Sequence, residues 1–240
     1  MSWLVSRNEW LRIYSRIREL FPELDFSRDQ AAADTLSLLL SNHAGVVDLE
    51  ELFSYLSSYD TAIVVGCSEE LAGEAMILRD ILRQRRALIA SANGATSDLL
   101  SIGITPTLIV TDLDGDFTAI SEASARKSIV VIHAHGDNLE KLPLVNQLKG
   151  PVIGSTQVEP RPHVHNFGGF TDGDRAVYIL FHAGFRKIYL AGFNFEKPSS
   201  CRGKHLLNIA VKKKKLEVAK WLISLLEEKG LEVCSIRELT

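Results

Sequence analysis

The sequence predicts an α/β protein with a mostly parallel β-sheet flanked by helices, preceded by a helical segment over residues 1–58. Two observations predict this class. From residue 59 to the end, short β-branched and apolar runs alternate with helical stretches of ten or more residues. These runs lack the polar alternation of a half-exposed strand, which is typical of strands buried on both faces of a parallel sheet.

The N-terminal segment carries helical periodicity. Apolar residues at i, i+3, i+4 and i+7 give the first helix one apolar stripe, formed by Trp10, Ile13, Tyr14 and Ile17. Pro22 interrupts this pattern. Ser27 and Gln30 have the spacing of a capping box and predict a second helix, through Leu40, while Asp48 predicts the start of a third. We expect these helices to cover one side of the sheet or to form a subunit contact.

The remaining chain, residues 59–240, is expected to form one α/β domain that carries the functional site. Its strands are predicted at Ala62–Val65, Ala87–Ala90, Leu108–Thr111, Ile129–Ile132, Val152–Gly154, Lys187–Ala191 and near Glu232–Ile236. Ligands of open α/β sheets bind beyond the carboxyl ends of the strands, so the residues after each run are candidate ligand contacts. They include Gly66, Ser68, Asn93, Gly94, Thr96, Thr156 and Gln157.

Asp112 and Asp114 lie one residue apart where an apolar run stops. In an extended chain both side chains would point to the same side and could hold one divalent cation that bridges phosphates. A pair of turn or helix-capping aspartates is the simpler alternative. The position of the pair at a strand end, beside other carboxylates, favours the metal site.

The segment His-Ala-His-Gly-Asp-Asn, residues 133–138, allows two interpretations. Asp137 could be a further Mg²⁺ ligand, with His135 in contact with phosphate or substrate and His133 structural. Alternatively, His133 and His135 could join His163 and His165 in a closed zinc site. Magnesium prefers oxygen ligands, and the first interpretation is favoured.

The segment NFGGFTDGDRA, residues 166–176, leads into a helix predicted over Arg175–Ala183. Free N–H groups at such a helix start attract anions, and Gly168 and Gly169 would permit close backbone approach. Thr171 belongs to the same loop. Asp172 and Asp174 are either helix caps or additional metal ligands.

Positive charge gathers before and within a last helix, predicted from about Leu206 to Lys229. The residues are Arg202, Lys204 and Lys212 to Lys215. Four successive lysines span more than a full helical turn, so at least one faces the body of the protein and could offset phosphate charge. Lys204 and Lys212 are the candidates for ligand binding.

Composition excludes several other classes of function. With 27 Lys and Arg against 30 Asp and Glu, the chain has a formal charge of −3, which implies neither a broad nucleic-acid surface nor a membrane surface. Cys67, Cys201 and Cys234 are distant and odd in number, which argues against a disulfide framework and a CxxC metal site. No secretory signal or membrane span is evident. We expect a cytoplasmic protein.

Several motifs in order resemble the archaeal 6-hydroxymethyl-7,8-dihydropterin pyrophosphokinase family, which is itself similar to thiamine pyrophosphokinases. They are SANGATSDLLSIGITP, IVTDLDG, VIHAHGDN, STQ, NFGGFTDGDRA and LAGFNF, followed by the lysine-rich helix. This resemblance implies a Rossmann-like catalytic domain, Mg²⁺ and ATP, transfer of diphosphate to a pterin, release of AMP, and a role in archaeal folate or methanopterin-type cofactor synthesis. It also implies a homodimer.

Two positions depart from the family pattern. Asn93 and Asn194 stand where related sequences usually carry aspartate. Each exchange removes a charge but keeps hydrogen-bonding ability, which leaves open an altered acceptor preference. Two other functions remain alternatives: a nucleotide-sugar-dependent glycosyltransferase-like protein, because an Asp-x-Asp pair can bind a sugar nucleotide through Mg²⁺, and a non-catalytic nucleotide sensor.

Overall fold

The computed structural model describes residues 2–199 and 208–239. In this part of the chain one eight-stranded sheet forms, and every strand pairing is parallel, in the order β6-β5-β4-β3-β2-β1-β7-β8. The strands are β1 (Thr61–Val65), β2 (Ala87–Ala92), β3 (Leu108–Thr111), β4 (Ile129–Ala134), β5 (Val152–Thr156), β6 (Val164–His165), β7 (Lys187–Ala191) and β8 (Glu232–Ser235). The predicted α/β class is confirmed.

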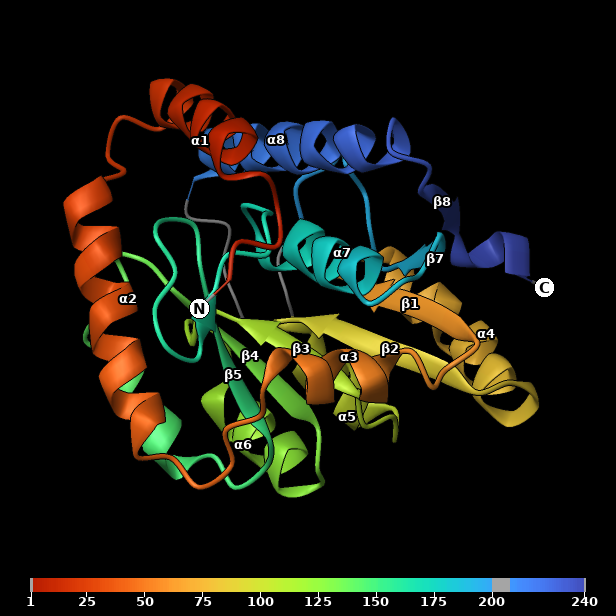
Figure 1. The fold of residues 1–240 in the computed structure, drawn as a ribbon. Coiled ribbons are helices and arrows are strands. Elements are labelled where there is room, and N and C mark those ends of the chain that lie inside the picture. The colour runs from red at the N-terminus through yellow and green to blue at the C-terminus, as the bar shows by residue number, and fades with distance from the viewer. Residues whose placement is uncertain (1, 200–207, 240) are drawn as a thin grey trace.

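Helices cover both faces of the sheet (Figure 1). They are α1 (Arg7–Leu20), α2 (Phe26–Ser41), α3 (Leu49–Leu56), α4 (Glu70–Gln84), α5 (Ala95–Ser101), α6 (Phe117–Ala125), α7 (Asp172–His182) and α8 (Ile209–Glu227), with 3-10 helices η1 (Leu142–Gln147) and η2 (Ile236–Leu239). Helix α7 packs on the central strands, and α8 and α1 lie beyond it (Figure 1). Helices α4, α5 and α6 cover the opposite face (Figure 1).

The predicted strands are confirmed, but three of them end two residues later than predicted. β2, β4 and β5 continue to Ala92, Ala134 and Thr156, because pairing with neighbouring strands extends the ladder beyond the apolar run. The two-residue strand β6 was missed, since its sequence, Val-His, gives almost no strand signal by itself.

Helix starts follow short polar caps. The Asp25 carboxylate accepts a hydrogen bond from the Ser27 backbone N–H at 2.8 Å and caps α2, so the predicted capping box at Ser27 is wrong by two residues. Asp48 caps α3 as predicted. Asn208 caps α8, and the predicted start of that helix at Leu206 lies outside the described residues.

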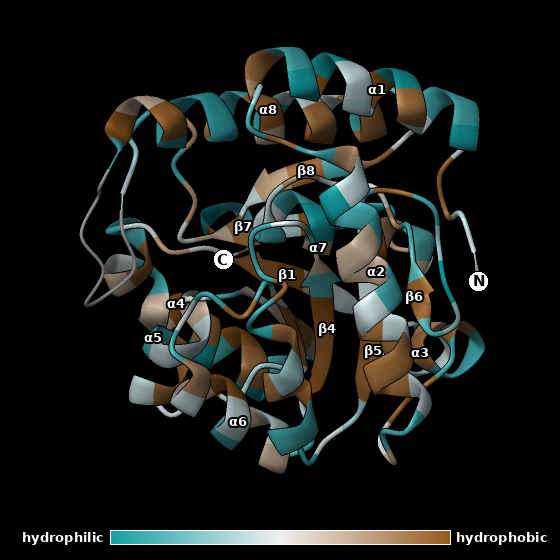
Figure 2. Ribbon diagram, turned by 90° about the vertical axis from the view of Figure 1, so that its left-hand side faces the viewer, coloured by the Kyte–Doolittle hydropathy of each residue, from teal (hydrophilic) through white to brown (hydrophobic). Residues whose placement is uncertain are grey.

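The N-terminal helices share one hydrophobic core with the sheet. Trp10, Tyr14 and Ile17 of the predicted apolar stripe are at most 2% exposed and belong to the same hydrophobic core cluster as strand residues such as Val131. Full burial of a large apolar side chain contributes about 1.5–3 kcal/mol, so the stripe docks α1 firmly. Figure 2 shows hydrophobic colour on the inner strands and hydrophilic colour on outward helical faces. The division at residue 58 stays a prediction.

Within residues 2–199 and 208–239, no helix combines the length and apolar character that crossing a membrane requires. Cys67 is disulfide-bonded, whereas Cys234 is free. The spacing and odd number of the cysteines, which argued against a disulfide framework, therefore did not exclude a single disulfide at Cys67.

Candidate functional site

A cavity of about 440 Å³ lies at the carboxyl edge of the sheet. Residues that follow six neighbouring strands line it. In spatial order these are Asn194 after β7, Ser68 after β1, Asn93 after β2, Asp112 after β3, His135 after β4 and Gln157 after β5. The expectation that polar groups from successive strands meet at one edge therefore describes this cavity well.

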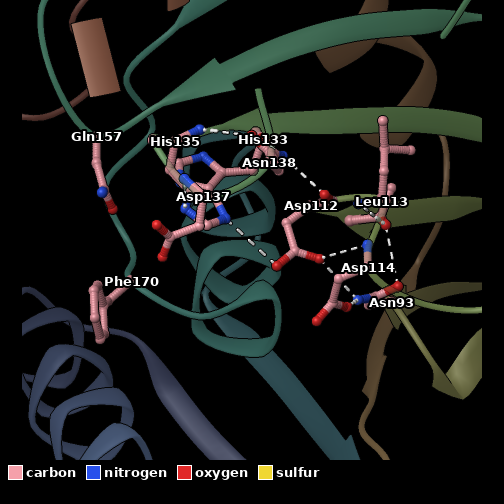
Figure 3. Close-up of polar contacts among 12 residues, drawn as sticks. Asn93, Asp112, Leu113, Asp114, His133, His135, Asp137, Asn138, Gln157 and Phe170 are labelled. Atoms are coloured by element: carbon pink, nitrogen blue, oxygen red, sulfur yellow. Dashed lines mark hydrogen bonds and ion pairs between the residues drawn. The ribbon is translucent and has the colours of Figure 1, made fainter. Parts of the chain in front are cut away.

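Asp112 and Asp114 lie together at the centre of this edge (Figure 3). The Asn93 side-chain amide donates hydrogen bonds to both carboxylates, at 3.0 Å to Asp112 Oδ1 and at a shorter distance to Asp114. Thr111 donates to the Asn93 carbonyl oxygen at 3.1 Å and holds its orientation. The chain between the aspartates is not extended, because Leu113 has a φ of 62°. A tight turn, rather than strand alternation, brings the two carboxylates to one side.

The charged form of Asp112 is favoured. Burial alone would raise the pKa of its carboxyl, but hydrogen bonds involving His135 and Asp114 hold that pKa below its ordinary value. Asp114 donates its backbone N–H to Asp112 Oδ1 at 3.1 Å, and His135 Nε2 lies 3.6 Å from Asp112 Oδ2. Asp112 is therefore an anion at neutral pH.

A third carboxylate, that of Asp172, faces the same cavity from the first turn of α7. Burial and the negative charges of Asp112 and Asp114 raise the pKa of Asp172 well above its ordinary value. The buried Arg175 guanidinium is a source of opposite charge behind this group, and burial lowers the pKa of Arg175 only to about 10, so it stays charged. The cavity wall therefore has an excess of negative charge that a cation would offset.

The 133–138 segment forms a tight loop after β4. The Asn138 amide donates to the His133 carbonyl at 2.6 Å and to the Asp112 carbonyl at 2.8 Å, so it joins the ends of β4 and β3. His135 and Asp137 line the cavity. His133 is 4% exposed and its Nε2 lies 3.1 Å from Arg175 Nη2; burial lowers the pKa of its imidazole well below the ordinary value.

The structure does not complete a metal site from protein groups alone. Among the described residues, no three His, Cys, Asp or Glu side chains are grouped so that they could hold a metal ion. The alternative of a closed site from four histidines is therefore wrong. Asp137 also does not join Asp112 and Asp114 in such a group, although it shares their cavity.

The two glycines before α7 have a structural role that differs from the expected one. Gly168 and Gly169 have φ values of 83° and 82°, and neither lines the cavity. A Cβ on Gly169 would lie 2.5 Å from the Arg175 Cα, so this glycine permits close packing on α7 rather than close approach to a phosphate. Asp174 is equally remote: it forms a capping box with Thr171 and is fully buried. Thr171 itself lines the cavity.

The other predicted contacts divide into two groups. Four line the cavity as expected: Gly66, Ser68, Gly94 and Gln157. Thr96 and Thr156 are buried away from it; the Thr96 hydroxyl hydrogen-bonds Ser91, and Thr156 accepts from the Val158 backbone N–H. The Thr96 hydroxyl therefore links the start of α5 to β2, and Thr156 stabilises the turn at the end of β5.

Of the four lysines that begin α8, Lys212 and Lys215 line the cavity, whereas Lys213 and Lys214 do not. Their separation of three residues places them on one helical face. The prediction that one or two of the four face the site is thus supported in position, and Lys215 is an additional member. Lys204 and Arg202 lie outside the described residues.

The part of the site that comes from the N-terminal segment is not predicted from the sequence. Phe21, Glu23 and Leu24, between α1 and α2, line the cavity, as does Phe170, whose ring centroid lies 5.1 Å from that of Phe21. Single apolar and acidic residues beside Pro22 carry no recognisable motif. Only the interrupted helical pattern marks this connection in the sequence.

Behind this wall lies a buried polar network centred on Asp29 of α2. The Asp29 carboxylate accepts hydrogen bonds from the Gly136 backbone N–H at 2.7 Å, from Gln157 Nε2 at 2.9 Å, and from the Tyr14 hydroxyl. Trp10 Nε1 donates to the Gln157 carbonyl at 2.8 Å. The N-terminal helices therefore hold two cavity segments, the loop after β4 and the end of β5.

Comparisons with known proteins agree with this arrangement. A family model described as "6-hydroxymethylpterin diphosphokinase MptE-like" matches residues 37–199. A protein of Pyrococcus furiosus named 6-hydroxymethyl-7,8-dihydropterin pyrophosphokinase is 39% identical, over 96% of each chain. Proteins of the same name from Methanothermobacter thermautotrophicus and Methanocaldococcus jannaschii are 38% and 34% identical, over 92% of this chain and 95% of theirs.

A solved structure, that of MAf glycosyltransferase from Magnetospirillum magneticum AMB-1, has a similar fold with a TM-score of 0.50. Its sequence is 12% identical, and the match covers 78% of this chain but 37% of that one. This likeness concerns the fold alone. From the family model and the extent of the three matches, the chain belongs to the 6-hydroxymethylpterin diphosphokinase MptE-like family.

Proposed function

We propose that this protein is a 6-hydroxymethyl-7,8-dihydropterin diphosphokinase. It transfers the β,γ-diphosphate of Mg²⁺-ATP to the hydroxymethyl oxygen of the pterin and releases AMP, as a step in folate or methanopterin-type cofactor synthesis. The names of three relatives that match almost the full chain support the reaction. The observation that carries it is the cavity itself, where the Asp112–Asp114 pair shares one space with Lys212 and Lys215.

The carboxylate pair fits a magnesium ion that also binds substrate phosphates. Mg²⁺ is usually held by one or two protein carboxylates, with phosphate oxygens and water as the other ligands. Asp112 and Asp114 are within reach of one amide group, and their negative charges add to the effect of burial in raising the pKa of Asp172. When bound there, Mg²⁺ would neutralise charge on the phosphates and orient them. Asp172 would stand beside this site.

The chain's own residues then position the reactants. Lys212 and Lys215 offset the remaining phosphate charge, and the hydroxymethyl oxygen attacks the β-phosphorus as the bond to the AMP oxygen breaks. His135, beside Asp112 and half-buried, accepts the proton of the hydroxyl group. Such transfer depends mainly on positioning and charge stabilisation, so no covalent nucleophile is needed.

The test is to incubate the protein with Mg²⁺-ATP and 6-hydroxymethyl-7,8-dihydropterin and to separate AMP from ADP by chromatography. Thiamine and no-acceptor samples are the controls. We expect AMP only with the pterin, and its loss in Asp114→Ala with unchanged thermal stability. ADP would indicate a monophosphoryl kinase, and no turnover would favour the sugar-transfer or sensor function. The same proposal includes a cytoplasmic location and a homodimer. Size-exclusion chromatography with light scattering tests the homodimer.

A further inference from the structure

The two ends of the cavity differ in chemistry. Strand order places Ser68 and Asn194, after β1 and β7, at one end, and His135 and Gln157, after β4 and β5, at the other. Asp114, after β3, lies between them. Figure 3 shows Gln157 and the Phe170 ring on one side of His135, and Asn93 with the aspartates on the other.

The positive groups belong to the β1–β7 end. Lys212 and Lys215 lie near the start of α8, and Figure 2 shows that start on the side of α4, away from α2. Backbone turns after β1 and β7 approach closely there, since a Cβ on Gly66 would lie 2.7 Å from the Gly192 carbonyl oxygen. This end suits a polyphosphate and its nucleoside, because cations and exposed backbone groups bind anions.

The β4–β5 end has a different lining. Phe21 and Leu24 come from the connection between α1 and α2, and Phe170 precedes α7. Phe21 is 2% exposed and packs against Phe170, which fixes the aromatic wall. Helix α2 packs on β5 and β4, and Asp29 hydrogen-bonds the loop after β4, so the connection is held in place from both sides.

We infer that this connection forms the subsite for the heteroaromatic ring of the acceptor, with the Glu23 carboxylate as the group that recognises its edge. This inference rests on the proposed function. A pterin presents a flat ring face and, at its pyrimidine edge, an amino group next to a ring N–H. Two parallel donors of this kind match the two oxygens of one carboxylate, as in a bidentate guanidinium pair.

Glu23 is suited to this task. Its side chain is exposed and lines the cavity, and no hydrogen bond or ion pair connects it to another residue within 2–199 or 208–239. Leu24 and Phe170 beside it offer apolar surface on which a flat ring can rest. A ring bound here places its hydroxymethyl group toward His135 and the aspartates, where the transfer takes place.

The experiment compares Glu23→Gln with Glu19→Gln, an exposed position on α1 that does not line the cavity. Steady-state AMP formation gives separate KM values for pterin and ATP. We expect Glu23→Gln to raise the KM for the pterin about 10-fold or more, because a charged hydrogen-bond partner is lost. The KM for ATP and the melting temperature should stay within error of the wild type, and Glu19→Gln should change neither constant.

A binding measurement separates failure of this inference from failure of the proposed function. 6-Hydroxymethylpterin, which is fluorescent, is titrated with each protein in the absence of ATP. Weaker pterin binding by Glu23→Gln supports the subsite even if the wild type forms no AMP, in which case only the reaction assignment fails. An unchanged pterin KM and affinity in Glu23→Gln, or a change confined to the KM for ATP, overturns the inference.

Discussion

Replacement of Asp29 by asparagine tests whether the N-terminal helices position the site. Asp29 is 1% exposed, and its two oxygens accept hydrogen bonds from three donors on Gly136, Gln157 and Tyr14. Burial, followed by the charge of Asp29, raises the pKa of Tyr14, so its hydroxyl remains a donor. Asparagine has one acceptor oxygen and one donor NH₂ group, so at least one of the three donors would face another donor.

The expected loss follows from these contacts. A hydrogen bond to a charged group contributes about 1.5–3 kcal/mol, and neighbouring bonds are not additive, so we expect Asp29→Asn to lower the free energy of unfolding by about 2–4 kcal/mol. At about 2–4 °C per kcal/mol for a chain of this size, the melting temperature falls by about 4–16 °C. Because Gly136 lies between His135 and Asp137, kcat should also fall, by about 10- to 100-fold.

Differential scanning fluorimetry and the AMP assay measure both effects. The matched control is Asp34→Asn, on the outer side of the same helix, where Asp34 forms a half-exposed ion pair with Arg161. Such a pair contributes less than about 1 kcal/mol. If Asp29→Asn melts at the same temperature as the wild type and keeps its kcat, the Asp29 network does not hold the site.

Three further predictions concern the lysines, the metal and acid stability. Lys212→Ala should raise the KM for ATP about 10-fold, as measured from initial rates. Lys214→Ala, at a position of α8 that does not line the cavity, should leave that KM unchanged. Asn93→Asp should lower the melting temperature in EDTA and enlarge the stabilisation by Mg²⁺, because it replaces an amide donor to two carboxylates by a third negative charge; equal Mg²⁺ stabilisation of both proteins would contradict this. Burial lowers the pKa of His165 to about 4, so the unfolded chain binds its proton first and stability should fall between about pH 6.5 and 4 by up to about 3 kcal/mol. Urea unfolding at pH 7 and 4.5 checks this, and His165→Gln should lose part of the pH dependence.

The sequence allowed most of the fold to be predicted because its signals are local. Buried strands are continuous apolar runs, and the polar groups that follow them must meet at one edge of a parallel sheet. This reasoning correctly brought Asp112, Asp114 and Gln157 to one cavity. It could not give the turn at Leu113, whose left-handed conformation brings the aspartates together, because leucine rarely adopts a positive φ.

The errors arose where a residue's role depends on distant partners. Gly169 lies in a glycine-rich segment typical of a phosphate-binding loop, but the space where its Cβ would lie is occupied by the backbone of Arg175. Thr156 was expected beyond a strand, but pairing with Ala134 extends β5 to include it. Phe21 and Asp29 carry no local motif, and their contacts with Phe170 and Gly136 exist only in the folded chain. Local patterns do not contain such long-range information.

The N-terminal helices also have a consequence for how the chain folds. The Trp10 indole N–H donates a hydrogen bond to the carbonyl of Gln157, which is 147 residues away. The Asp29 carboxylate accepts one from the backbone N–H of Gly136, which is 107 residues away. During synthesis α1 and α2 therefore leave the ribosome long before the strands that bury them. Their apolar faces stay exposed in a partly folded intermediate until those strands are made. Contacts of such long sequence separation slow folding. We expect refolding to end with the docking of these helices, so the last step of folding is also the step that completes the catalytic cavity.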